Sequence, residues 1–138
     1  MSIPPVVQAF YDRVWNAGDL EAIAELATDD FSFRGSLGPE LRGAEAFMDY
    51  ARSVRTALAD YRCQILACVQ EGDRAFARML FGGRHAAAFR GFEPTGRPIQ
   101  WAGAALFTFR GKRIASLWVL GDLDSLDELL RANAAEAG

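Results

Sequence analysis

The sequence predicts an α+β domain in which a strongly curved, mixed or antiparallel sheet wraps around helices near the amino terminus. Apolar residues recur at helical spacing up to residue 58, and from residue 61 the pattern alternates through two long hairpins. A last helical pattern follows residue 122. Helices that precede a run of strands are typical of α+β domains rather than of alternating βαβ units.

The bulk composition fits one domain. The 138 residues are enough for one hydrophobic core, so we expect residues 1–138 to form a single domain. The net charge of -3 and the scattered arginines give no basic stripe, which argues against a nucleic-acid partner. The start, MSIPPVVQAF, has no signal-peptide pattern and no window is long and apolar enough to span a membrane, so we expect a cytoplasmic protein with no membrane partner.

Neither cysteines nor histidines suggest a disulfide or a metal. Cys63 and Cys68 fall on one predicted strand, about 16 Å apart at ~3.3 Å per residue, which is beyond disulfide reach. One histidine and two separated cysteines do not form a ligand set with zinc spacing.

The first elements are predicted to be a helical hairpin, a short strand and a third helix. Pro4 and Pro5 favour a helix start, residues 16–18 end that helix, and Asp19 can cap a second one. Residues 31–34 alternate as a short strand. The apolar faces of the three helices are Val7, Phe10 or Tyr11 and Val14; Leu20, Ile23 and Leu26; and, after Gly43, Phe47, Ala51, Val54 and Leu58.

The second half is predicted to be mostly strand. Residues 61–69 and 74–81 form one hairpin, and 99–109 with 113–120 form another. Gly82-Gly83 suggests a bulge or sharp bend, residues 86–97 a loop, and the tail after the last helix a frayed end.

His85 and Asp122 are the candidate catalytic residues. His85 is the only histidine, and Asp122 follows an apolar strand end beside Trp118. Burial there would disfavour the charged carboxylate and make it a better base, and the imidazole could share a proton with it. The alternative for Asp122 is helix capping, since Ser125 lies three residues later. For His85 the alternative is an ordinary strand-end position.

Several other residues have a functional and a structural interpretation. Arg78 could orient a substrate oxygen or pair with an acid on the sheet surface. Strict alternation turns Arg78 and His85 to opposite faces unless a bulge at Gly82-Gly83 intervenes. Trp101, Phe107 and Trp118 could form a substrate cavity wall or simply fill a core.

The segments FYDRVWNAGDLEAIAEL, EGDR, PTGRPI and FRGKRIASLW, followed by Asp122, resemble the SnoaL-like polyketide cyclases of the NTF2-like superfamily over nearly the whole chain. The resemblance implies a cone with an apolar cavity and a cofactor-independent enzyme. It implies that Asp122 is the general acid/base of an aldol closure, and that Arg78 and His85 match the family's strand arginine and histidine. Arg34 and Leu129 stand where many members have histidine and glutamine, a departure that implies a different substrate.

We therefore expect an enzyme acting on a small apolar or polyketide-like substrate, with Asp122 as the base and His85 as a hydrogen-bond partner of the enolate. Substrate-binding candidates are Arg78, Trp101, Phe107, Trp118, Tyr11 and Trp15. The alternatives are an epoxide hydrolase, hydratase, isomerase or lyase on the same fold, or a non-catalytic binding or assembly module. We also expect a homodimer through an apolar outer sheet face that carries Leu66, Met79, Leu106 and Leu117.

Overall fold

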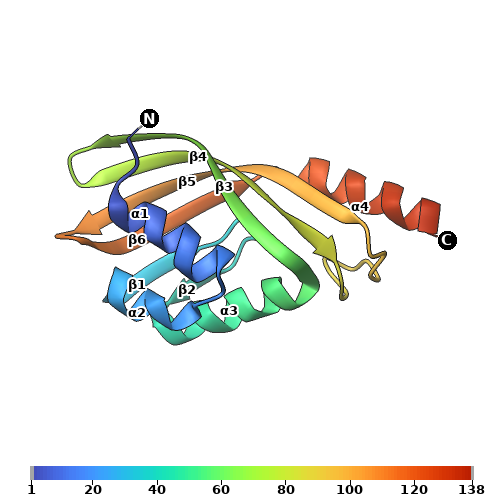
Figure 1. Cartoon of the computed structure of the whole chain (residues 1–138), viewed down its shortest axis with the longest axis horizontal. Coiled ribbons are helices and arrows are strands. Elements are labelled where there is room, and N and C mark those ends of the chain that lie inside the picture. The colour runs from blue at the N-terminus through green and yellow to red at the C-terminus, as the bar shows by residue number, and fades with distance from the viewer. Residues whose placement is uncertain (1, 138) are drawn as a thin grey trace.

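The computed structural model describes residues 2–137 and shows one six-stranded sheet with helices (Figure 1). The helical segments are α1 (Pro5–Ala9), the π-helical η1 (Phe10–Asn16), the 3-10 segment η2 (Leu20–Ala22), α2 (Ile23–Leu26), α3 (Gly43–Ala57) and α4 (Leu123–Ala137). The strands are β1 (Ala27–Arg34), β2 (Glu40–Arg42), β3 (Leu58–Glu71), β4 (Arg74–His85), β5 (Pro98–Arg110) and β6 (Arg113–Gly121). The predicted α+β fold class is confirmed.

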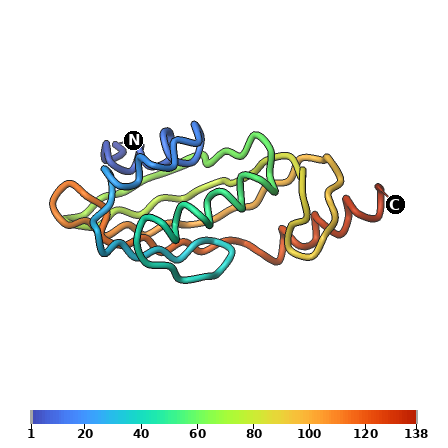
Figure 2. Tube along the Cα trace, turned by 90° about the horizontal axis from the view of Figure 1, so that it is seen from below, coloured from blue at the N-terminus to red at the C-terminus, as the bar shows by residue number. Residues whose placement is uncertain are grey.

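The sheet is mixed and strongly curved. Its strand order is β2-β1-β6-β5-β4-β3, with β1 and β6 parallel and all other neighbours antiparallel. The helices α1, α2 and α3 lie on one side of the sheet, and α3 runs along it (Figures 1 and 2). We call the face that packs against these helices the inner face and the opposite one the outer face. Helix α4 lies at one end of the sheet, beside the loop between β4 and β5.

The inner face holds the core because alternate residues of each strand point to it. Phe107 of β5 is fully buried, and its ring lies 5.9 Å from those of Phe10 and Tyr11 on η1. Phe47 of α3 lies 5.7 Å from Phe10. Edge-to-face and tilted aromatic packing thus joins the helices to the sheet.

The predicted elements are present with longer boundaries. All four long strands extend past the predicted limits, and the short strand Glu40–Arg42 was not predicted. The expectation of a frayed tail is wrong, because α4 continues to Ala137 and buries Leu126, Leu130 and Asn133. The last residue, Gly138, lies outside the described residues.

Gly82 and Gly83 do not form a bulge in β4. Strand β4 pairs with β5 without interruption from Arg74 to Arg84. The irregularity is on β3, where Asp60, with a positive φ of 57°, and Tyr61 together face Gly83. A Cβ at Gly83 would lie 3.0 Å from the Ala59 carbonyl oxygen, so the glycine permits this close approach.

The outer face carries several apolar residues, of which Leu106 was expected there, but two other expected residues point inward. Met79 and Leu117 point into the core with exposed fractions of 0% and 2%, so their predicted outward position is wrong. Each lies an even number of positions from buried residues of its own strand, and strict alternation places such residues on the same, inner face. The outer face instead carries an apolar cross-strand row that runs over β3, β4, β5 and β6: Val69, Phe76, Leu106 and Trp118, with Leu120 beside it.

Gly103 on the inner side of β5 makes room for the Phe81 ring. A Cβ there would lie 2.3 Å from Phe81 Cε2 and 2.9 Å from the Leu120 carbonyl oxygen. We expect Gly103→Ala to lower the free energy of unfolding by about 1–3 kcal/mol, because the ring must shift within a packed core. Urea denaturation would measure this. The control Ala102→Ser, exposed on the outer face, should change stability by less than about 0.5 kcal/mol; equal effects would contradict the steric explanation.

Candidate functional site

The concave interior of the sheet contains a small cavity lined by aromatic and polar side chains. Its volume is about 20 Å³, which is room for about one water molecule. The interior is therefore largely filled by the protein's own side chains, and its lining contains no carboxylate. The lining residues are Phe10, Tyr11, Trp15, Phe33, Ser36, Tyr50, Tyr61, Cys63, Phe81, Leu117 and Val119.

Two hydrogen-bond donors in this interior have no partner. Tyr11 Oη and the indole Nε1 of Trp101 are buried, and within residues 2–137 neither makes a hydrogen bond. Leaving a buried polar group unpaired costs about 1–3 kcal/mol, so such groups call for a structural or functional explanation. Burial raises the pKa of Tyr11 well above its usual value, which keeps its hydroxyl protonated as a donor. Tyr11 lies on the π-helical segment η1, a geometry frequent at functional sites.

The remaining polar groups of the cavity are held by the protein itself. Tyr50 is hydrogen-bonded to Leu37 and Ser36, and burial raises its pKa to about 12. Burial likewise raises the pKa of the Cys63 thiol to about 12. The Asn16 amide accepts a hydrogen bond from Cys63 N at 2.7 Å and donates one to Cys63 O at 3.0 Å, which fixes the end of η1 against β3. These groups form the frame of the site.

His85 lies at the end of β4 and is fully buried. Both ring nitrogens lack a hydrogen-bond partner among the described residues. Its ring is 6.3 Å from that of Phe89, which lies 6.1 Å from Trp101. Trp101 in turn lies 5.6 Å from Phe81 of the cavity wall. An aromatic layer therefore connects His85 to the interior cavity, with Phe89 between them.

Asp122 is exposed and caps α4. Its Oδ1 accepts a hydrogen bond from Ser125 N at 3.1 Å, as the capping interpretation expected. The expectation of a buried carboxylate beside Trp118 is wrong, because Trp118 is 45% exposed on the outer face. Strand β6 nevertheless passes the interior just before Asp122. A Cβ at Gly121 would lie 2.9 Å from Ser36 Cβ and 3.1 Å from Trp101 Nε1.

The structure separates the other predicted site residues into two sets. Tyr11 and Trp15 line the cavity and Trp101 lies beside it, whereas Phe107 is a core residue packed between aromatic rings. Trp118 is on the outer face, so its predicted place in a substrate cavity wall is wrong. Arg78 is on the outer face as well, so the predicted contact with a substrate in the interior is wrong and the surface alternative describes its position. Arg78 lacks the bulge that would have turned it inward.

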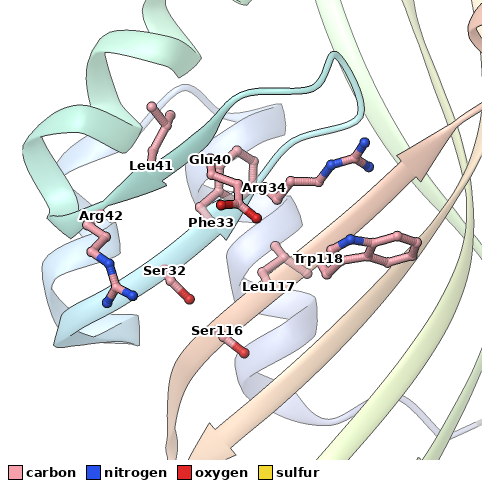
Figure 3. Close-up of a pocket in the computed structure, with 9 residues that line it drawn as sticks. All are labelled: Ser32, Phe33, Arg34, Glu40, Leu41, Arg42, Ser116, Leu117 and Trp118. Carbon is pink, nitrogen blue, oxygen red and sulfur yellow. The ribbon is translucent and has the colours of Figure 1, made fainter.

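The outer face also contains a groove of about 540 Å³ over β2, β1 and β6 (Figure 3). Ser32 and Ser116 face each other across β1 and β6, and Arg42 lies beside Ser32. The Arg34 guanidinium is 5.4 Å from the centre of the Trp118 ring and donates a hydrogen bond to Val119 O. This groove was not predicted because β2 was not recognised.

Two further candidates in the interior, Tyr50 and Tyr61, were also missed. Nothing in the sequence pattern marks them as site residues, because each lies on a predicted helix or strand with an ordinary apolar pattern. Phe89 was missed because it lies in the loop 86–97, where no strand alternation predicts which way a side chain points.

Among residues 2–137, no group of three or more potential ligands could hold a metal ion. No helix in the same range has the length and hydropathy needed to cross a membrane.

The chain belongs to the SnoaL-like polyketide cyclase family, whose family model matches residues 5–128. No curated protein matches the sequence significantly. The resemblance found in the sequence motifs is thereby confirmed.

Solved structures share the fold. A candidate polyketide cyclase from Acidithiobacillus ferrooxidans is 24% identical with a TM-score of 0.85, covering 97% of this chain and 100% of that chain. IdmH, a candidate polyketide cyclase from Streptomyces antibioticus, is 24% identical with a TM-score of 0.79, covering 91% and 96%. A Catenulispora acidiphila protein with a ketosteroid isomerase-like fold, in complex with trimethylamine, is 19% identical with a TM-score of 0.80, covering 97% and 95%. The fold is therefore NTF2-like.

The buried tyrosine and thiol predict a loss of stability at alkaline pH. The pKa of Tyr50 and that of Cys63 rise to about 12 from ordinary values of 10.0 and 9.0. Because folding raises both, their contribution is complete below pH 9 and is lost as the pH rises toward 12, at up to about 1.4 kcal/mol per pH unit for each group. Urea midpoints measured from pH 8 to 10.5 should fall, and should fall less steeply above pH 10 in Tyr50→Phe. A flat profile would contradict the burial of both groups.

Proposed function

We propose that this chain is a cofactor-independent enzyme of the cyclase type that acts on a carbonyl-activated apolar substrate at the concave interior. The observation that carries this proposal is the pair of unpartnered donors, Tyr11 Oη and Trp101 Nε1, in an aromatic interior of a SnoaL-like chain. A carbonyl oxygen that becomes an enolate gains negative charge, and preorganised donors stabilise that charge most strongly where water is excluded.

In the proposed reaction Asp122 is the general base. Its carboxylate removes a proton from a carbon between two carbonyl groups, and the resulting enolate oxygen accepts hydrogen bonds from the two donors. The enolate carbon then attacks a second carbonyl, and the new alkoxide takes the proton back from Asp122. The passage of Gly121, the residue before Asp122, beside Trp101 Nε1 supports a base at the rim of the interior. His85 would hydrogen-bond a second substrate oxygen.

Two single substitutions, one at each residue, test the roles of Tyr11 and Asp122. We expect Tyr11→Phe to lower turnover by about 10²–10³, since one oxyanion donor is lost, while leaving stability unchanged or higher because an unpaired buried hydroxyl is removed. Asp122→Asn should lower turnover by about 10²–10⁴ and keep the fold, because asparagine caps a helix as well as aspartate. The assay is exchange of the α-protons of 2-tetralone, an apolar bicyclic ketone, for deuterium, followed by NMR.

Wild-type exchange no faster than that in buffer alone would overturn the proposed chemistry. Wild-type activity that persists unchanged in both variants would exclude these two residues. The sequence-based alternative of hydrolysis with Arg78 beside Asp122 receives no support, because Arg78 is exposed on the outer face and strand β5 separates it from β6 residue Leu120 in the same cross-strand row.

A second candidate function, a non-catalytic assembly module, is favoured by the nearly filled interior together with the apolar outer face. Either function is compatible with the homodimer that we propose through the row of Phe76, Leu106 and Trp118. Burial of the half-exposed Phe76 and Leu120 against a second copy would remove apolar area from water.

Analytical ultracentrifugation at micromolar concentration would test the dimer. The wild type should sediment as a dimer, and Phe76→Glu, which places a charge on the outer face, should sediment as the 15.1 kDa monomer. The control Lys112→Gln, which lowers the net charge by the same amount as Phe76→Glu, lies at the β5–β6 turn and should remain dimeric. A monomeric wild type would overturn the homodimer.

A further inference from the structure

A tight turn in the loop between β4 and β5 holds Phe89 against the interior. Phe89 and Phe92 pair through two backbone hydrogen bonds of 2.9 Å. Arg90 and Gly91 between them have positive φ angles of 50° and 85°, the geometry of a type I′ turn. Arginine rarely adopts this conformation, so contacts elsewhere must hold Arg90 in it.

Helix α4 supplies those contacts. Arg90 Nε and Nη2 donate to the two carboxylate oxygens of Asp127 at 2.7 and 3.0 Å. These side chains are 25% and 29% exposed, the most buried ion pair among the described residues. The hydrogen bonds from Arg90 lower the pKa of Asp127, as expected for a fork-shaped pair. A second pair, Arg97 with Glu136, joins the other end of the loop to α4.

Phe89 fills the space where the site would otherwise continue. Its side chain is 7% exposed and lies between His85 and Trp101, whose three ring nitrogens all lack hydrogen-bond partners within residues 2–137. The same end of the fold contains Asn133 of α4, buried with its Nδ2 unpaired. The open cavity beyond Trp101 measures about 20 Å³, far below the 300–1,000 Å³ typical of a small-molecule site.

We propose that Phe89 is a plug that occupies part of the ligand site, and that the Arg90–Asp127 pair is the latch that holds it in place. This inference rests on the proposed function for the location of the site. A bicyclic or larger apolar molecule with an oxygen group would enter when the turn moves away from α4. Its ring would replace Phe89 on Trp101, and its oxygen would reach the imidazole of His85. Phe89 thereby selects which ligands enter and how often.

The expected gain in affinity depends on how often the plug leaves the site. If Phe89 is out of the site in about 0.1–10% of molecules, the apparent affinity is only that fraction of the affinity of the open form. Removal of the plug restores the full affinity. Phe89→Ala should therefore bind an apolar bicyclic ligand about tenfold or more tightly than the wild type. Loss of one partly buried ion pair shifts the same equilibrium less, so Asp127→Asn should bind about two- to fivefold more tightly.

The probe is 2-naphthol, titrated into the full chain by isothermal calorimetry and by ¹⁵N-edited NMR of the imidazole. Because His85 is the only histidine, its ring signals are assigned without ambiguity. We expect these signals to shift on binding to Phe89→Ala. Asp124→Asn is the matched control, since Asp124 is an exposed carboxylate in the first turn of α4 and makes no ion pair within residues 2–137.

A folded Phe89→Ala variant with wild-type affinity and unmoved His85 signals would overturn the plug. An equal gain in Asp124→Asn would overturn the latch, because it would indicate a general charge effect. If Phe89→Ala does not fold, hydrogen exchange of the Phe89 and Phe92 amides decides: Asp127→Asn should speed it about two- to fivefold, and unchanged exchange refutes the proposal. Inactivity toward 2-tetralone would overturn the proposed chemistry while leaving 2-naphthol binding as an independent test of the plug.

Discussion

The packing of Phe47 against the rings around it is the interaction on which the rest of the structure depends. This fully buried side chain of α3 lies 4.8 Å from Phe33, 5.6 Å from Trp15 and 5.9 Å from Phe31, measured between ring centres. It therefore joins α3, η1 and β1 at one point. Since the bent sheet can bury its inner face only against these helices, this contact sets both the depth of the interior and the position of the Tyr11 hydroxyl.

The interior combines a tightly packed aromatic frame with a few polar groups that the protein does not satisfy. Tyr50 and Cys63 have partners within the fold, whereas Tyr11, Trp101 and His85 present unpaired nitrogen or oxygen atoms. Unpaired groups of this kind reduce stability, and natural proteins retain them mainly where a ligand or water completes them. Tyr11, Trp101 and His85 are therefore the interior groups that a bound molecule could complete within residues 2–137.

Hydrophobic alternation predicted the long strands because each has one buried face and therefore a period of two. A period near 3.6 predicted the helix that begins at Gly43, and the turn residues 93–96 predicted the loop at residues 86–97. The short strand Glu40–Arg42 escaped prediction, since three residues are too few to show a period. The outward assignment of Met79 failed because an apolar residue on an otherwise mixed strand was read as exposed, although its parity with Ala77 and Phe81 places it inside.

The candidate site was harder to predict than the fold because side-chain direction at strand ends depends on tertiary contacts. Nothing local in the sequence distinguishes Asp122 as a helix cap from Asp122 as a buried base, and the choice is made by where α4 begins. The role of Phe89 depends on Arg90 meeting Asp127, 37 positions later in the chain. Such a pairing leaves no periodic signal in the sequence.

The parallel pairing of β1 with β6 has a consequence for how the chain is made. The Arg34 side chain reaches a carbonyl 85 positions later, and β1 borders only the three-residue β2 on its other side. During synthesis the first strand therefore has an open edge until β6 has been made and has left the ribosome. Contacts this distant in sequence slow folding, and an open apolar edge favours pairing with other chains. The edge of β1 therefore stays unpaired throughout the synthesis of α3, β3, β4 and β5, the elements that lie between β2 and β6 in the chain.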